Sequence, residues 1–278
     1  MLYLLLAILS SAMISIIMRI SADKVKGNLS MLAVNYLICL LLAAGYAGFQ
    51  VVLPHKPGFF GTVGMGTVNG ALFLAGFLLL QINTQKNGIV LSSIFMKLGL
   101  LVPMAVSVFL FAELPTWLQI AGFCMAIGAI VLINFDKTAI SAGSKAGLIV
   151  LLLAAGPGDA MAKVFEVLGS DQLSEQYLFF TFAVALLLCL ALVVWKRERP
   201  GIREVLFGVL IGIPNFFSAK FLLKSLEELP AVIVYPSYSV ATILLVSLAG
   251  VLVFRERLGK QQWIGLVAIL AALVMLNI

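Results

Sequence analysis

An internal duplication constrains this chain more than any other feature of its sequence. Two sets of residues recur, one at a spacing of 143 positions and one at a spacing of 144. The repeated residues are Phe111, Glu113, Gln119, Gly122, Ala129, Val131 and Asn134, which recur as Phe254, Glu256, Gln262, Gly265, Ala272, Val274 and Asn277, together with Ala75, Phe77, Leu78 and Leu79, which recur as Ala219, Phe221, Leu222 and Leu223. Because a repeat determines the plan of a fold, the sequence predicts two related units, residues 1–138 and 139–278.

The composition places both units in a lipid bilayer. Apolar residues make up 63% of the chain and charged residues 11%, which is more hydrocarbon than a water-soluble protein of 278 residues can bury. A helix of about 20 apolar residues is long enough to cross a bilayer. We expect ten such spans, at residues 2–20, 31–52, 59–81, 88–111, 117–134, 146–167, 176–195, 204–225, 231–253 and 261–277.

The number of spans in each unit predicts how the two units are related. Five is odd, so the second unit crosses the membrane in the opposite direction to the first. The predicted fold class is therefore an all-α integral membrane protein, with ten transmembrane helices arranged as two inverted five-helix repeats. Inverted repeats are typical of secondary transporters, whose substrate site lies near the middle of the membrane between the repeats.

The distribution of lysine and arginine predicts the orientation of the chain. Thirteen of these residues lie in or beside the odd-numbered loops, whereas only Lys56 and Lys224 lie at the even-numbered loops. Cytoplasmic loops are enriched in Lys and Arg. We therefore expect the odd loops in the cytoplasm and both termini outside, in a multi-pass protein of the inner or plasma membrane.

Ionisable side chains inside the expected spans are the first candidates for function. They are Lys97, Lys163, Lys220, Lys224, Asp159 and Glu166. A charge near the centre of a bilayer costs on the order of 3 kcal/mol, so such residues usually pair with one another or line a water-filled pathway.

The depths of several of these residues predict a charged cavity. Asp159 and Lys163 are four residues apart, which places them on one helix face where they can form an ion pair. At 1.5 Å per residue, Asp159, Lys163 and Lys220 lie within about 6 Å of one another in depth, and Tyr238 reaches a similar level. Either this group binds a substrate or a proton, or Asp159 neutralises one lysine and joins the sixth span to the eighth. Lys163 and Lys220 can also extend toward the membrane interface.

Lys97 is predicted to bind a group of the substrate. No acidic residue of the first half lies at its depth, and an unpaired ammonium in hydrocarbon loses its proton or finds a partner. A substrate carboxylate or phosphate is one such partner. Pairing with Asp159 and a position at the lipid edge or near the cytoplasm are the alternatives.

Uncharged polar residues in the spans are candidate hydrogen-bonding groups of the same site. They are Ser11, Asn69, Ser93, Asn215 and Tyr238, of which Asn69 and Asn215 occupy corresponding spans of the two halves. Hydrogen bonding between helices is the alternative for each of them. At the ends of the fourth and ninth spans, Glu113 and Glu256 are predicted to cap the N-terminus of the next helix, where negative charge is favoured.

The repeated segments resemble a known family. The residues that carry the resemblance are the two Phe-x-Glu…Gln-x-x-Gly…Asn segments, at 111–134 and 254–277, and the stretch from Lys220 to Arg257 with Leu229-Pro230-Ala231, Tyr235-Pro236 and Ser239. They resemble the ten-helix EamA-type branch of the drug/metabolite transporter (DMT) superfamily. The resemblance implies alternating access through a central cavity lined by helices 1, 3, 4, 6, 8 and 9. It also implies small metabolites as solutes, often amino acids. Typical members of this branch have both termini in the cytoplasm, whereas the Lys and Arg distribution predicts the opposite orientation for this chain.

The sequence therefore predicts a secondary transporter for a small polar metabolite, with an amino acid or an organic anion as the preferred solute. Lys97, Lys163 and Lys220 are the candidates for a negative group, Asp159 is the candidate for an ammonium or a coupled proton, and Asn69, Asn215 and Tyr238 are the candidates for orienting the solute. These candidates are net cationic, which favours an anionic or zwitterionic solute. A lipid-linked flippase, or a non-transporting partner subunit of the same fold, is the alternative.

Other functional classes are disfavoured by the residues that the chain lacks. It has no paired Asp motif and no constellation around its one histidine, His55, of the kind that an intramembrane enzyme uses. Its three cysteines, Cys39, Cys124 and Cys189, lie in apolar spans without the spacing of metal ligands. We expect no catalytic residue, metal, cofactor or nucleic acid. The expected partners are a small-molecule solute and the lipid bilayer, protons are a candidate coupling ion, and a monomer or a homodimer is the expected working unit.

Overall fold

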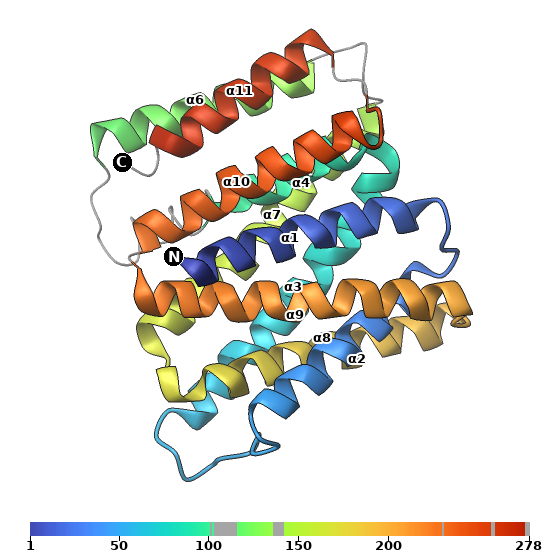
Figure 1. The fold of residues 1–278 in the computed structure, drawn as a ribbon, viewed down its shortest axis with the longest axis vertical. Helices are drawn as coiled ribbons and strands as arrows, with labels where there is room; N and C mark the ends of the chain where they lie inside the picture. The colour runs from blue at the N-terminus through green and yellow to red at the C-terminus, as the bar shows by residue number, and fades with distance from the viewer. Residues whose placement is uncertain (101, 103–115, 136–141, 230, 257–258, 276–278) are drawn as a thin grey trace.

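The computed structural model describes residues 1–100, 102, 116–135, 142–229, 231–256 and 259–275. All regular structure in these residues is helical, with no β-strand among them (Figure 1). The elements are α1 (Leu2–Ala22), α2 (Asn28–Tyr46), α3 (Phe59–Asn87), α4 (Ile89–Lys97), η1 (Leu98–Leu100), α6 (Trp117–Phe135), α7 (Ala142–Leu168), η2 (Asp171–Leu173), α8 (Ser174–Lys196), α9 (Ile202–Glu228), α10 (Ala231–Leu252) and α11 (Lys260–Met275). The prediction of an all-α protein is confirmed.

Several of these helices have the length and composition of membrane spans. Within the described part of the chain, six are long and apolar enough to cross a bilayer: α1, α2, α3, α7, α8 and α9. The last two helices contain shorter apolar segments, Ser237–Leu252 and Trp263–Ala272. Each span expected from the sequence overlaps one of the described helices. The prediction of a multi-pass membrane protein is confirmed, whereas the number of ten spans and their inverted arrangement stay predictions.

The two faces of α1 show how the sequence suits a helix to lipid. Its exposed face carries large apolar side chains, as at Leu5, Leu9 and Met13, which are spaced four residues apart. Its buried face carries small or hydroxylated residues, as at Ala7 and Ser11. A helix satisfies its backbone hydrogen bonds within itself, as lipid requires. Because apolar side chains can face lipid, the interior positions are free to carry polar groups.

The helices pack in pairs that relate the two halves of the chain. α1 packs against α9 and α10, α7 packs against α3 and α4, and α2 and α8 pack against each other. In addition α2 packs against α9, and α8 packs against α3. α6 and α11 pair with each other along the upper side of Figure 1. Exchanging α1 with α7, α2 with α8, α3 with α9 and α4 with α10 leaves this set of pairs unchanged, as expected for duplicated units; their division at residue 138 stays a prediction.

Two helix crossings are close because glycines lie at them. On α3, a Cβ added to Gly70 would meet the α8 backbone at 2.4 Å. On α9, a Cβ added to Gly208 would meet the α2 backbone at 2.7 Å. Each glycine belongs to a Gly-x-x-x-Gly pair, Gly66 with Gly70 and Gly208 with Gly212. Small residues at this spacing let helix backbones approach in lipid, where no hydrophobic force draws them together.

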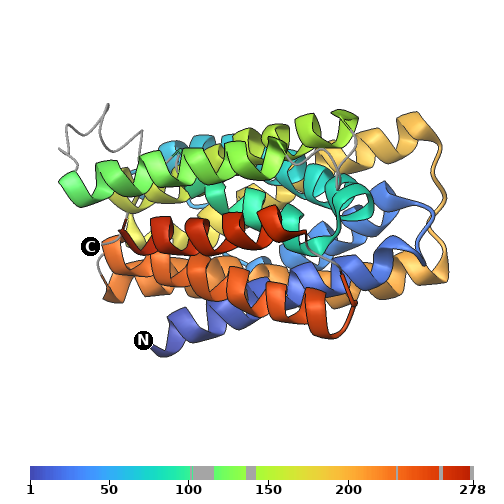
Figure 2. The ribbon, with the colours of Figure 1, turned by 90° about the horizontal axis from the view of Figure 1, so that it is seen from above.

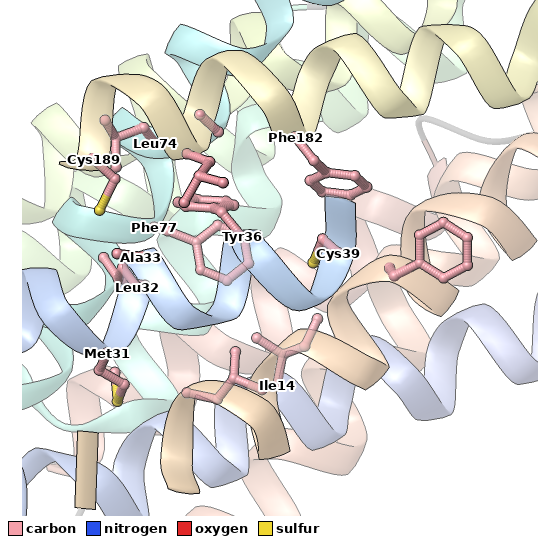
Figure 3. Packing of buried hydrophobic residues seen from close by; sticks show 14 of the residues in the cluster. Ile14, Met31, Leu32, Ala33, Tyr36, Cys39, Leu74, Phe77, Phe182 and Cys189 are labelled. Carbon is pink, nitrogen blue, oxygen red and sulfur yellow. The ribbon is translucent and has the colours of Figure 1, made fainter. Parts of the chain in front are cut away.

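An apolar core lies around these crossings (Figure 3). Tyr36 of α2 is fully buried in it, and its hydroxyl donates to the carbonyl oxygen of Phe73 at 3.1 Å. The Tyr36 ring also contacts Phe77 edge-on, with 6.1 Å between the ring centroids. Cys39 and Cys189 are free and buried, as expected for small core residues. This core joins α2 and α3 of the first half to α8 and α9 of the second.

One edge of the bundle collects the loops that carry many of the cations. Arg19 of α1 pairs with Glu256, beyond the end of α10, at 3.5 Å, and Arg203 of α9 donates to the carbonyl oxygen of Lys24 at 3.5 Å. We call this edge the charged edge; it comprises residues 19–30, 83–90, 196–204 and 254–256. It lies to the right in Figure 1, and Figure 2 shows the same loops at the right-hand end of the helices. These loops are the odd-numbered loops of the sequence, and their cytoplasmic location stays a prediction.

The three tryptophans lie at helix ends and are exposed. Trp117 begins α6 and is 87% exposed, Trp195 lies one residue before the end of α8, and Trp263 lies in the first turn of α11. Tryptophan at such positions is typical of the membrane interface, where its amphipathic ring is favoured. The tryptophans are therefore absent from the interior of the described helices.

Candidate functional site

A cavity of about 100 Å³ lies between helices of both halves. A site needs only about 10–15 Å³ of such volume to hold one water molecule, so this cavity has room for a small solute. Its walls come from α1, α3, α4, α7, α9 and α10, which correspond to the first, third, fourth, sixth, eighth and ninth spans. These are the helices that the family resemblance implied. α8 contributes in addition, through Tyr177 and Leu178.

The cavity contains most of the residues that the sequence singled out. Seven of the nine candidates line it: Ser11, Asn69, Ser93, Lys97, Asp159, Asn215 and Tyr238. Lys163 and Lys220 lie outside this lining. The remaining walls are largely apolar, with Ile14, Phe73 and Phe77 among them.

Lys97 is the buried cation of the cavity. It lies in the last turn of α4, where the carbonyl end of the helix favours positive charge. Its ammonium lies 3.9 Å from the centroid of the Tyr238 ring, close enough for a cation–π interaction. Only 7% of Lys97 is exposed, and within the described residues no carboxylate lies within 4 Å of its nitrogen. The charge is therefore partly stabilised but has no ionic partner in contact.

Tyr238 is held in place from two other helices. Its hydroxyl lies 3.0 Å from the hydroxyl of Ser218 on α9, and either group can donate. The Ser218 hydroxyl also approaches the carbonyl oxygen of Ala7 on α1 at 3.5 Å. These contacts orient the ring beneath Lys97 from three helices, so the cation has a defined position in the cavity.

Asp159 is the anion of the same cavity. It follows Pro157 on α7 and is half-buried. Asp159 and Lys97 line the same cavity, although within the described residues the two side chains do not form an ion pair within 4 Å. Thus neither the expected pairing of Asp159 with Lys163 nor its alternative pairing with Lys97 is found as a direct contact in the described residues.

Lys163 and Lys220 have other partners, which corrects the expectation that their charges converge with Asp159. Lys163 pairs with Glu166, one turn further along α7, at 2.7 Å. Lys220 pairs with Glu175 at 2.5 Å and lies over the ring of Tyr46 at 3.5 Å. Depth alone does not decide whether a side chain faces the cavity. Rotation about the helix axis also matters for Lys220, whereas Lys163 lies on the same face as Asp159 and is drawn to Glu166 instead. A long lysine side chain can also reach a carboxylate at i+3 as readily as one at i−4.

Two amides join helices beside the cavity, as the alternative interpretation of the sequence proposed. Asn69 of α3 donates to the Tyr177 hydroxyl of α8 at 2.7 Å. Asn215 of α9 donates to the Asn35 side-chain oxygen of α2 at 3.1 Å. These two bonds connect corresponding helix pairs, because α3 and α8 exchange with α9 and α2.

Two polar atoms in the cavity wall are buried without any hydrogen-bond partner. They are the side-chain oxygen of Asn69 and the hydroxyl of Ser93. Asn69 is 2% exposed and Ser93 is 3% exposed, so bulk water does not reach them freely. Leaving a buried polar group unpaired costs about 1–3 kcal/mol. Such groups beside a cavity are suited to binding a ligand that completes their hydrogen bonds.

Tyr177 is the lining residue that the sequence analysis missed. It is the second residue of a span expected at 176–195, so its position in the sequence suggests the membrane edge rather than a cavity. Its ring stacks on Phe165 of α7, with 4.1 Å between centroids. The two polar residues immediately before it, Glu175 and Gln176, are the only nearby sequence signal that polar groups enter this end of the span.

The charge of the described lining differs from the expectation. The sequence predicted a net cationic site, because three lysines were placed there with one aspartate. With Lys163 and Lys220 elsewhere, the described lining residues carry one cation, Lys97, and one anion, Asp159. Such a cavity is electrostatically complementary to a solute that carries one charge of each sign.

Glu256 caps a different helix from the one predicted. Its carboxylate accepts the backbone N–H of Ile89 at 2.8 Å and that of Val90 at 3.2 Å. It therefore caps α4, in the other half of the chain, rather than the next helix, α11. Spacing along the sequence indicated a cap but not its partner, which only the packing of α10 against α4 determines. The corresponding Glu113 lies outside the described residues.

Comparisons with known proteins agree with this fold. The EamA-like transporter family matches residues 146–278. A protein of Haemophilus influenzae (strain Rd), described as uncharacterized, is 25% identical over 286 residues, which cover 97% of this chain and 95% of that protein. A solved crystal structure of a protein covers 99% of this chain and 94% of its own, with a TM-score of 0.64 at 16% identity, which is a likeness of fold. The match over residues 146–278 agrees with the resemblance of the repeated segments to the EamA-type branch of the DMT superfamily.

Proposed function

We propose that this protein is a secondary transporter that moves a small zwitterionic metabolite, of the amino-acid type, across the cell membrane by alternating access. The observation that carries the proposal is one buried cation and one anion, Lys97 and Asp159, in a single cavity between helices of both halves. The match to a transporter family supports the general class. The two opposite charges favour a zwitterion over the organic anion that the sequence left open.

Lys97 binds the carboxylate of the solute in this proposal. The cation lies over Tyr238 and lacks an ionic partner in contact, so a carboxylate would complete its neutralisation. The unpaired hydroxyl of Ser93, one helical turn earlier on α4, is available to donate to the same group.

Asp159 binds the ammonium of the solute. The unpaired side-chain oxygen of Asn69 accepts a second hydrogen bond from the same ammonium. This oxygen is near Asp159, because it lies 3.7 Å from the position of a Cβ on the neighbouring Gly158. The apolar walls, among them Phe73 and Phe77, then accept an apolar side chain. In the same proposal Asp159 carries the coupled proton when the solute is absent, and Lys163 and Lys220 stabilise helix packing through their own ion pairs.

The alternating-access mechanism is proposed from the inverted repeat. α4 begins at the charged edge, whereas its counterpart α10 ends there, as an inverted pair requires. The cavity lies between the two sets of helices, so a change in their packing can expose it to either side. A solute can drive such a change only if it binds the two states with different affinities.

Matched ligands test the proposal. Leucine carries both charges, N-acetyl-leucine lacks the ammonium, and leucinamide lacks the carboxylate. We expect leucine to stabilise the purified protein against heat more than either analogue, and to be taken up by proteoliposomes. Asp159→Asn is expected to reduce the preference for leucine over N-acetyl-leucine, and Lys97→Gln to reduce the preference over leucinamide. Lys163→Gln, outside the cavity, serves as the control.

Other outcomes would point elsewhere. Equal stabilisation by leucine and N-acetyl-leucine would remove the ammonium site and leave an organic-anion transporter. Stabilisation by glycerophosphoethanolamine, without an effect of any amino acid, would favour the flippase alternative. Leucine uptake that is unchanged in Lys97→Gln would contradict the assignment of Lys97.

A further inference from the structure

Three glutamates of the second half bind backbone N–H groups of the first half at the charged edge. Glu256 accepts from Ile89 and Val90, at the start of α4. Of the other two, Glu198 lies in the loop between α8 and α9, and Glu204 lies in the first turn of α9. The first N–H groups of a helix have no partner within it and carry partial positive charge. Carboxylates at these positions therefore form charge-assisted hydrogen bonds, which are stronger than neutral ones.

Glu198 and Glu204 hold the segment that begins α2. Glu198 accepts from the backbone N–H of Leu29 and of Ser30, each at 3.1 Å. Glu204 accepts from the N–H of Lys26 at 3.1 Å and from that of Gly27 at 3.2 Å. Together with Glu256, these residues attach the starts of both α2 and α4 to the opposite half.

Glycines lie against all three carboxylates. A Cβ on Gly27 would lie 3.1 Å from the Glu198 carboxylate, and one on Gly201 would lie 2.5 Å from that of Glu204. Gly88 has φ +79°, and its Cβ would lie 2.9 Å from the Glu256 carboxylate. At each of these positions a side chain would crowd the carboxylate, so the glycine allows the backbone and the glutamate to approach each other.

The polar contacts described at the opposite edge are of a different kind. This edge comprises Met1, residues 46–59 and 168–176, and Glu228. In the described part of the chain, the Gln176 side chain donates to the carbonyl oxygen of Gln50 at 2.9 Å, and the exposed Met1 amino group lies 3.6 Å from Glu228. The ion pair between Lys220 and Glu175 lies within the second half. Within the described residues, the glutamate carboxylates that bind backbone N–H groups of the other half lie at the charged edge.

We propose that Glu198, Glu204 and Glu256 form a latch that holds the charged edge closed, and that the cavity opens toward this edge only when the latch is released. The proposal rests on the alternating-access function proposed above. The carboxylates are partly accessible: Glu204 is 7% exposed, and the Glu256 side chain is 13% exposed. Water can therefore replace the backbone N–H groups when the halves separate. The described conformation is the latched one.

Cysteine labelling tests the latch. In a variant without Cys39, Cys124 and Cys189, Ser15→Cys places one thiol in the cavity wall, and a membrane-impermeant maleimide is added to vesicles of either orientation. We expect Glu198→Gln and Glu256→Gln to raise the labelling rate from the charged edge about tenfold, which corresponds to a shift of about 1.4 kcal/mol between the two states. Glu228→Gln, at the opposite edge, is the matched control and is expected to have no effect.

The outcomes separate the latch from the proposed transport. Labelling needs no solute, so the expected increase supports the latch even if no uptake of leucine is found. If neither single variant, nor Gly88→Ala, changes labelling from the charged edge relative to Glu228→Gln, the latch is wrong. Equal increases from both sides would also overturn it, because they would indicate general loosening rather than release of one edge.

Discussion

The cavity and the charged edge both contain charged groups that are largely shielded from water, but the two regions differ in whether these groups have bonding partners. At the charged edge, Glu256 and its two companions bind backbone N–H groups at 2.8–3.2 Å. In the cavity, Lys97 has no carboxylate within 4 Å among the described residues, and the Ser93 hydroxyl is unpaired. A charged group whose hydrogen bonds are satisfied within the protein stabilises the structure, whereas a charged group without an ionic partner is available to bind a ligand. The difference predicts that changes in the cavity alter solute binding, and that changes at the charged edge alter the stability of the closed packing there.

The largest effect is expected from Lys97→Gln. Removing one partner of a buried charged pair costs about 2–5 kcal/mol, so uptake should fall by about 30-fold or more. The thermal midpoint should not fall, because the lysine has no ionic partner in contact to lose. Uptake into proteoliposomes and a melting curve in detergent measure the two quantities. A large loss of stability with normal uptake would place Lys97 in the structural group instead.

Glu256→Ala is expected to have the opposite pattern. It leaves the N–H groups of Ile89 and Val90 without their acceptor, at about 1–3 kcal/mol for each buried group. The protein should therefore lose about 2–6 kcal/mol of stability, measured by denaturation in detergent. Glu228→Ala is the control, because its carboxylate is about half exposed and, among the described residues, forms an ion pair with the Met1 amino group alone; a change within about 0.5 kcal/mol is expected there. Similar losses in both variants would contradict the distinction.

Gly88→Ala tests the same contact from the other side. The backbone of Gly88 has φ +79° and ψ 168°, a conformation that costs other residues about 1–3 kcal/mol. The added Cβ would also displace the Glu256 carboxylate. We expect a loss of stability of that size without loss of solute affinity. Gly64→Ala is the control, since its Cβ would meet nothing within 4 Å and its helix would gain slightly.

The smallest effect is expected from Ser93→Ala. Loss of one hydrogen bond to the solute costs about 0.5–1.5 kcal/mol, or about threefold to tenfold in affinity. Stability should stay equal or rise, because a buried hydroxyl without a partner is removed. Isothermal titration with leucine and a melting curve measure both. A clear loss of stability would mean that Ser93 is satisfied within the protein and is not a ligand group.

Composition and helical period were enough to single out several residues that line the cavity; that these residues bind a solute stays a prediction. Lys97 and Asp159 were found because charges are rare and costly in apolar spans, and both line the cavity. Asn69 and Asn215 were found because they occupy matching spans of a repeat. Depth alone misplaced Lys163 and Lys220, because each lysine pairs with a carboxylate outside the cavity lining. Sequence spacing also assigned Glu256 to the wrong helix, because sequence distance does not reveal a partner that lies 167 residues away.

The sequence by itself determined that this chain is a helical membrane protein with internal duplication, since hydrocarbon content and repeat spacing are properties of the linear chain. Only the tertiary structure decided which charges remain unneutralised. Whether a lysine is paired depends on how each helix is rotated and on which helix of the other half packs against it. That rotation is set by contacts such as the approach of α3 to α8 at Gly70, where the absence of a side chain lets the two backbones touch.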